Sequence, residues 1–177
     1  GAGYGGATAA KYIRMWSNTG IDVTVVEPSP EFISCPMSNL VLGGSEDLAF
    51  LTTSYANLAT RHGVKIIRDT ATSVDVDKRV LKLTGANELA YDRLVLALGA
   101  APNVGMAPGA AEHALTFKGA GDAVQIRNRV IDLFEAAALT DDPWVQRRLL
   151  TFVVVGAGHA GTELMAAVEE LARGILL

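Results

Sequence analysis

Apolar residues follow two different spacings along the chain. A spacing of three to four predicts amphipathic helices, and short continuous or alternating apolar runs predict strands. The expected helices are residues 7–17, 45–62, 122–139 and a segment from Thr162 onward. The expected strands are residues 22–26, 64–67, 93–98 and 149–155. Because strands and helices alternate along the chain, the pattern favours an α/β fold with a parallel sheet.

The segments between these elements carry turn signals. In residues 71–83, side chains that face one side or the other of a strand alternate before and after Asp77-Lys78, which predicts a β-hairpin. Residues 100–121 are rich in Ala, Gly and Pro, so we expect a loop or crossover. Ser45 is expected to cap the helix 45–62, and Asp141-Asp142-Pro143 to end the helix 122–139.

A glycine loop opens the chain. Gly1-Ala2-Gly3-Tyr4-Gly5-Gly6 precedes the first helix, with Gly1 suited to a tight turn, Gly3 to close approach of a pyrophosphate, and Gly6 to packing of the helix on a sheet. Glu27 ends the next strand, 21 positions after Gly6, where a carboxylate accepts from ribose hydroxyls. The alternatives are an ordinary glycine turn and a solvated strand end.

A second glycine loop, Gly156-Ala157-Gly158-His159-Ala160-Gly161, follows the strand 149–155 and opens a helix. This order of strand, glycines and helix is the one required for binding a second dinucleotide. The residue that selects NADH or NADPH is expected roughly 20 residues beyond Gly161, past Leu177, so the choice stays open. The alternative is a structural turn that binds nothing.

Composition narrows the possible functions. The net charge is −4 and no cluster of five Lys or Arg occurs, which argues against a nucleic-acid partner. A single cysteine, Cys35, excludes an internal disulfide. No His, Cys or carboxylate pair has metal-ligand spacing, so we predict no metal. No apolar run reaches the roughly 18–20 residues of a membrane-spanning helix.

The chain begins inside a glycine motif without Met and stops inside an apolar run, so we expect both ends to be cut. The expected domains are 1–110, the first nucleotide-binding domain without its first strand; 111–148, a crossover and linking helix; and 149–177, the first βα unit of a second nucleotide-binding domain.

Four segments together resemble the two-dinucleotide-binding flavoprotein oxidoreductases, in the branch of type II NADH dehydrogenases, sulfide:quinone oxidoreductases and flavocytochrome c sulfide dehydrogenases. They are GAGYGG with Glu27, ATSVDVDKRVL, YDRLVLALGAAP and LLTFVVVGAGHAGTEL. The resemblance implies a Rossmann-like FAD domain interrupted by a Rossmann-like NAD(P)H domain. FAD would bind the first glycine loop and NAD(P)H the second.

The resemblance also implies roles for single residues. Ala97 and Gly99 would lie near the flavin diphosphate, and the backbone of Ala71 would contact the adenine. Glu163 would lie near the nicotinamide and the flavin ring, as a positioning group. Cys35 lies in SCPMSN, which resembles a segment that carries flavin through a thioether; the alternative is a small buried hydrophobic residue.

Two functions follow from the resemblance, and a third, of a different class, does not depend on it. The leading one is a FAD-dependent NAD(P)H dehydrogenase that passes electrons to a quinone-like acceptor, cytoplasmic and held at the inner face of a membrane through a C-terminal region outside this chain. The second is a periplasmic sulfide-oxidising flavoprotein with a cytochrome subunit, against which the lack of a cysteine between residue 120 and the second glycine loop counts. The third is a non-catalytic nucleotide-binding module or an inactive fragment, and we expect this chain alone to be inactive.

Overall fold

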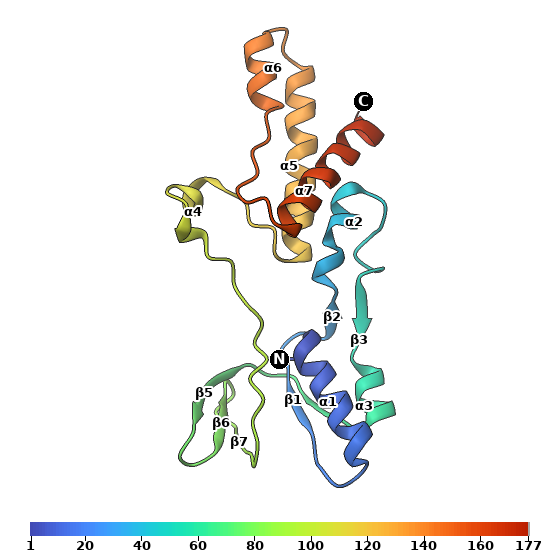
Figure 1. The fold of residues 1–177 in the computed structure, drawn as a ribbon, viewed down its shortest axis with the longest axis vertical. Helices are drawn as coiled ribbons and strands as arrows, with labels where there is room; N and C mark the ends of the chain where they lie inside the picture. The colour runs from blue at the N-terminus through green and yellow to red at the C-terminus, as the bar shows by residue number, and fades with distance from the viewer. Residues whose placement is uncertain (177) are drawn as a thin grey trace. The chain divides into compact units, whose positions relative to one another are not determined.

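The computed structural model describes residues 1–176, which form helices and short strands (Figure 1). Contacts divide the chain into two compact units. Unit 1 contains residues 1–32 and 53–100, and unit 2 contains residues 33–52 and the chain from residue 101 onward. The strands β2 (Glu31–Ile33) and β3 (Thr52–Ser54) pair where the chain leaves unit 1 and returns to it.

Unit 1 combines two helices with two small sheets. The helices are α1 (Tyr4–Ser17) and α3 (Ala56–His62). The strands β1 (Thr24–Val26) and β4 (Lys65–Ile67) pair in parallel, with Val25 opposite Ile66. The other sheet is antiparallel and contains β5 (Ala71–Asp75), β6 (Val80–Leu83) and β7 (Glu88–Ala90) in that order.

Unit 2 is helical apart from its share of β2 and β3. Its α-helices are α2 (Ser38–Gly43), α4 (Ala110–His113), α5 (Ala120–Ala138), α6 (Pro143–Leu149) and α7 (His159–Leu171). Its short 3-10 and π-helical turns are η1 (Cys35–Met37), η2 (Val104–Met106) and η3 (Ala172–Leu176). Helix α2 packs against both α5 and α7.

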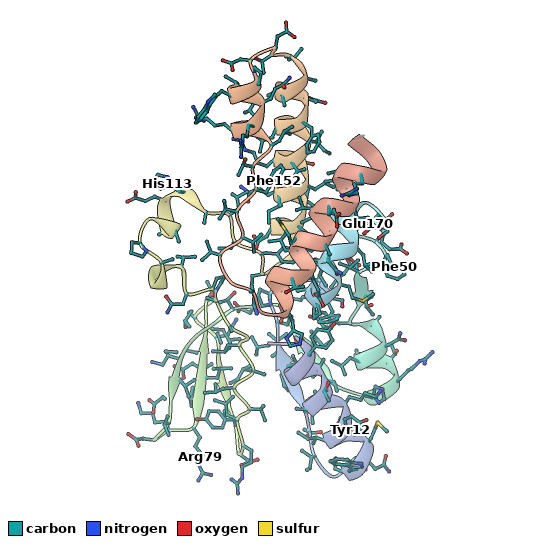
Figure 2. All side chains as sticks on the ribbon, turned by 45° about the horizontal axis from the view of Figure 1, so that its top comes forward. Tyr12, Phe50, Arg79, His113, Phe152 and Glu170 are labelled. Carbon is teal, nitrogen blue, oxygen red and sulfur yellow. The ribbon has the colours of Figure 1, made fainter. Side chains whose placement is uncertain are left out.

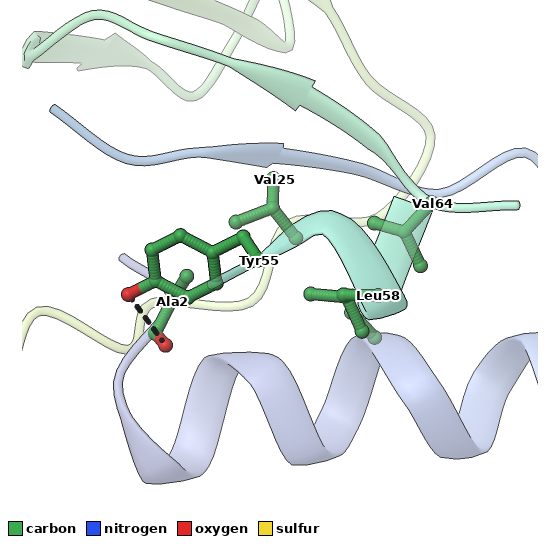
Figure 3. Packing of buried hydrophobic residues seen from close by; sticks show 6 residues of the cluster. Ala2, Val25, Tyr55, Leu58 and Val64 are labelled. Carbon is green, nitrogen blue, oxygen red and sulfur yellow. Dashed lines mark hydrogen bonds between the residues drawn. The ribbon is translucent and has the colours of Figure 1, made fainter. Parts of the chain in front are cut away.

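Each unit has its own hydrophobic core. The core of unit 1 joins the first glycine loop to α1, α3 and β1, and it contains Ala2, Ala10, Val25, Tyr55, Leu58 and Val64 (Figure 3). The core of unit 2 contains Leu42, Ala123, Val130, Ala167, Val168 and Leu171. Phe152, labelled in Figure 2, packs on this second core. Its ring stacks on that of Phe134 at 6.4 Å between centroids.

The α/β class predicted from the sequence is confirmed, as are its strongest elements. Helices α1, α5 and α7 and strands β1 and β4 lie within three residues of the predicted bounds. The hairpin is β5–β6, turning at Asp77-Lys78, and β7 extends it. The predicted apolar stripe of α5 faces the core, since Ala123, Val130 and Ala137 are buried.

The helix predicted over 45–62 is wrong in its first half. Ser45 does not cap a helix; instead its backbone N–H and its hydroxyl both donate to the carbonyl of Leu40 and close α2. Gly44, at φ +83°, makes the left-handed turn that ends α2. Only Ala56–His62 is helical, because β3 pairs with β2 just before it.

The strands predicted over 93–98 and 149–155 are also wrong. A strand is defined by hydrogen bonds to a neighbouring strand, and neither segment pairs with one among residues 1–176. Leu149 instead ends α6, a helix that Asp142 caps and Pro143 begins. The apolar side chains of both segments are therefore largely exposed, for example Leu98 and Val153.

Three further features complete the fold. The loop predicted over 100–121 contains the short turns η2 and α4. Trp16 and Trp144 are 80% and 76% exposed. No helix within the described part of the chain has the length and apolar character to cross a membrane.

Candidate dinucleotide-binding loops

In the first glycine loop, each glycine has a distinct steric situation. A Cβ on Gly6 would collide with the carbonyl oxygen of Gly1, so this position accepts only glycine. A Cβ on Gly1 would lie 2.6 Å from the carbonyl oxygen of Ala97. By contrast, no atom lies within 4 Å of a Cβ on Gly3, which leaves open space at the start of α1.

The second glycine loop is built in the same way. A Cβ on Gly161 would collide with the carbonyl oxygen of Gly156, and a Cβ on Gly158 would meet nothing within 4 Å. Gly156 has φ +107°, which favours glycine. The glycine requirement predicted for both loops therefore has a steric basis.

Both loops open a helix with backbone alone. Gly3 and Gly158 are the N-caps of α1 and α7, and neither has a side chain that could satisfy the first-turn N–H groups. The first helical hydrogen bonds match, at 2.9 Å from Ala7 to Gly3 and 3.0 Å from Thr162 to Gly158. Such a helix start attracts anions through its N–H groups and its dipole.

Glu27 follows β1 and binds the first glycine loop directly. Its Oε2 accepts a hydrogen bond of 2.7 Å from the N–H of Ala2, and its Oε1 accepts one of 3.0 Å from the N–H of Ser29. Burial alone would raise the pKa of Glu27, but these two backbone donors, together with the hydroxyl of Ser29, hold the pKa below 4.5.

Tyr55 lies beside the first glycine loop, and the sequence alone did not identify it as part of the site. It is 7% exposed, and its hydroxyl donates a hydrogen bond of 3.2 Å to the carbonyl of Ala2 (Figure 3). Burial, and then the nearby Glu27 charge, raise the pKa of Tyr55. The apolar spacing suggested a helix stripe that included Tyr55, and no sequence signal pointed to a contact 53 residues away.

Ala97 lies against the first glycine loop, as the steric environment of Gly1 shows. Its Cβ is also 3.3 Å from the place a Cβ would take on Gly6. Gly99, two residues on, is exposed with φ +79°. Ala71 begins β5 in the same unit, where it is exposed and lies opposite Leu83.

Cys35 and Glu163 lie in unit 2. Cys35 is exposed, so the alternative that it is a buried hydrophobic residue is wrong; its thiol donates to the carbonyl of Ile33 at 3.6 Å. Glu163 is an exposed residue near the start of α7. The roles proposed for these two residues stay predictions.

A cavity of about 280 Å³ lies beside Gly3. Its walls are mainly apolar and include Tyr4, Phe32 and Leu58, and the rings of Tyr4 and Phe32 meet edge to face at 4.9 Å. Lys11 and His62 also line it, and no carboxylate does. This side of α1 therefore favours anionic over cationic groups.

The chemistry available to the loops is binding rather than bond cleavage by side chains. Within the described residues, no group of His, Cys, Asp and Glu is placed to hold a metal ion. What both loops offer is backbone N–H groups at a helix start, next to a glycine that allows close approach, which suits a pyrophosphate.

The chain is similar to known proteins over nearly its full length. It is 33% identical to the external alternative NAD(P)H-ubiquinone oxidoreductase B4 of Arabidopsis thaliana mitochondria, over 96% of this chain and 31% of that protein. It is 30% identical to the type II NADH:quinone oxidoreductase Ndh of Mycobacterium tuberculosis, over 99% of this chain and 38% of that protein. The chain thus spans about a third of the length of these relatives.

Two solved structures share the fold. NDH2 from Plasmodium falciparum in complex with NADH has a TM-score of 0.80 at 22% identity, covering 99% of this chain and 37% of that one. The sulfide:quinone oxidoreductase of Aquifex aeolicus has a TM-score of 0.65 at 20% identity, covering 76% and 31%.

The sequence model of one family covers all of the glycine loops, the hairpin and the helices described above. It is the model described as pyridine nucleotide-disulphide oxidoreductase, and it matches residues 1–177. The match thus extends over the whole chain and is not confined to single motifs. The chain belongs to the pyridine nucleotide-disulphide oxidoreductase family.

Proposed function

We propose that this chain is part of a FAD-dependent NAD(P)H dehydrogenase that delivers electrons to a quinone. The observation that carries the proposal is the shared geometry of the two glycine loops. In each, the last glycine packs on the carbonyl of the first, the glycine at the N-cap borders open space, and a helix without a side-chain cap begins. Two such loops in one chain call for two dinucleotides.

The first loop fits the diphosphate of FAD. The open space at Gly3 admits a phosphate, and the start of α1 supplies backbone donors and a favourable dipole. The cavity beside Gly3 lacks carboxylates that would repel the phosphates. FAD, when bound, would accept a hydride from NAD(P)H and pass electrons to an acceptor.

Residues around the first loop would hold the rest of that cofactor. A carboxylate has about four acceptor positions, and on Glu27 part of them is used by the N–H of Ala2 and by the N–H and hydroxyl of Ser29. The remaining ones suit ribose hydroxyls. Ala97 and Gly99 would border the diphosphate, and the backbone of Ala71 the adenine.

The second loop would hold the pyrophosphate of NAD(P)H at the start of α7, with Gly156, Gly158 and Gly161 as backbone contacts. Glu163, one turn into the helix, would position the nicotinamide rather than exchange a proton. The names of the relatives support this electron donor, since they are NAD(P)H or NADH oxidoreductases.

The quinone acceptor is also proposed from the relatives. Both proteins described above are named as ubiquinone or quinone oxidoreductases. This chain covers about a third of their length.

The test uses the full-length gene product under anaerobic conditions. The purified protein should be yellow, NADH or NADPH should bleach the visible flavin absorption, and a quinone should restore it. Sulfide, added in place of the nicotinamide, should leave the absorption unchanged.

Other outcomes would overturn the proposal. Bleaching by sulfide and not by reduced nicotinamide would favour a sulfide-oxidising enzyme. A protein that stays colourless with added FAD would favour a non-catalytic nucleotide-binding module.

A further inference from the structure

Ala2 is held from both sides by side chains that come from distant parts of unit 1. It is fully buried, its N–H donates to Glu27 at 2.7 Å, and its carbonyl accepts from Tyr55 at 3.2 Å. Figure 3 shows the second of these bonds. The residue between the first two glycines of the loop is therefore fixed at both of its peptide groups.

Peptide planarity extends these two bonds to the glycines. The peptide group before Ala2 contains the carbonyl of Gly1, and the group after it contains the N–H of Gly3. Glu27 thus fixes the plane that carries the carbonyl against which Gly6 packs. Tyr55 fixes the plane that carries the N–H of Gly3, and that N–H points away from the hydroxyl.

The Tyr55 side chain is well suited to act as such a support. Its ring belongs to the core of unit 1 together with Val25 and Leu58 (Figure 3), so packing restricts its movement. Because burial raises its pKa, the hydroxyl keeps its proton at neutral pH and remains a donor.

We propose that Tyr55 is a positioning residue of the first dinucleotide site, which aims the N–H of Gly3 at the cofactor phosphate. This inference rests on the proposed function. It assigns part of the FAD affinity to a hydroxyl that acts through its bond to the backbone of the loop.

The test is Tyr55→Phe in the full-length protein, with Tyr12→Phe as the matched control. Both changes remove one hydroxyl from unit 1, but Tyr12 lies on the surface of α1 at 41% exposure. We expect the FAD Kd of Tyr55→Phe to rise about fivefold, the size expected for one neutral hydrogen bond. The Kd for NAD(P)H and the kcat at saturating FAD should stay unchanged, and Tyr12→Phe should match the natural protein.

The control for a general loss of stability is Val64→Ala, which trims the same core without removing a hydroxyl and lies outside the cavity beside Gly3. This variant should lower Tm more than Tyr55→Phe while its folded form keeps the FAD Kd. If Val64→Ala weakens FAD binding as much as Tyr55→Phe, the role of Tyr55 is only structural and the inference is wrong.

The natural protein offers a measurement that does not depend on the folding of Tyr55→Phe. With tyrosine ring carbons labelled for NMR, FAD binding should shift the signal of Tyr55 and leave that of Tyr12 in place. An unshifted Tyr55 signal, or an unchanged FAD Kd in Tyr55→Phe, overturns the inference while leaving the proposed function intact. Failure of the natural protein to bind FAD overturns the proposed function instead.

Discussion

The Oε2 atom of Glu27 lies 2.7 Å from the backbone nitrogen of Ala2, although α1 and β1 separate the two residues along the chain. From the sequence, this acidic residue was expected to serve a ribose. In the structure its Oε2 links the end of β1 to the glycine loop, and its Oε1 accepts a hydrogen bond from the N–H of Ser29. Glu27 therefore shapes the loop, in addition to any contact with a cofactor.

Glu27→Gln should destabilise the chain by about 1 kcal/mol at pH 7, because the charge-assisted bonds to two backbone N–H groups weaken. The pKa of Glu27 is lowered in the folded state. Its contribution is therefore complete above pH 4.5, the ordinary pKa, and is lost as the pH falls through the lower folded value. Urea unfolding at several pH values should show the difference between the two proteins shrinking in that acidic range.

Glu88→Gln is the matched control for this prediction. Glu88 pairs with Lys82 at 3.9 Å, but both side chains are at least half exposed, so the pair should contribute little. A difference between Glu27→Gln and the natural protein that persists unchanged at pH 2 would show that Glu27 does not act through its charge.

The parts of the fold that were predicted correctly are those whose signals are local. A glycine that must pack on a carbonyl five residues earlier, such as Gly6 or Gly161, is required by its own loop. Likewise, the long apolar stripe of α5 shows the face that packs against its core without reference to the rest of the chain.

The parts that were predicted wrongly depend on distant partners. An apolar run such as 93–98 becomes a strand only beside another strand. Serine is a typical N-cap residue, yet Ser45 closes α2 instead of starting a helix, because Gly44 turns the chain there. The contact of Tyr55 with Ala2 joins residues 53 positions apart, and no spacing rule reaches that far.

Two alanine variants of the first loop should separate folding from binding. Gly6→Ala would force a Cβ onto the carbonyl of Gly1 and should lower stability by at least about 2 kcal/mol. Gly3→Ala meets no atom within 4 Å, so its Tm should stay close to that of the natural protein. Its Cβ would nevertheless occupy the space intended for a phosphate, and FAD binding, followed by flavin absorption, should fall at least tenfold. Normal FAD binding by Gly3→Ala would exclude a phosphate at this glycine.

A corresponding pair of alanine variants in the second loop tests the binding of the other dinucleotide. Gly161→Ala should lower stability because a Cβ there meets the carbonyl of Gly156, whereas Gly158→Ala faces open space and should fold normally. In the full-length protein, Gly158→Ala should raise the KM for NAD(P)H at least tenfold and leave the FAD content unchanged. Loss of FAD from Gly158→Ala with normal nicotinamide kinetics would reverse the assignment of the two loops.

The first turn of α5 contains a carboxylate that accepts three hydrogen bonds. Asp122 Oδ2 accepts from the N–H groups of Lys118 at 2.7 Å and Gly119 at 3.1 Å, and from the hydroxyl of Thr116 at 3.2 Å. Burial raises the pKa of Asp122, but these bonds outweigh burial and leave the pKa below 3.8.

Asp122→Ala should therefore cost about 1–2 kcal/mol at pH 7, the usual effect of losing a helix cap. Since the folded pKa lies below the ordinary one, this stabilisation is complete above pH 3.8 and is lost as the pH falls through the folded value. Asp132→Asn, on the exposed side of the same helix, is the control and should change stability by less than about 0.5 kcal/mol. Equal unfolding free energies for Asp122→Ala and Asp132→Asn at pH 7 would mean that the cap does not stabilise α5 against its core.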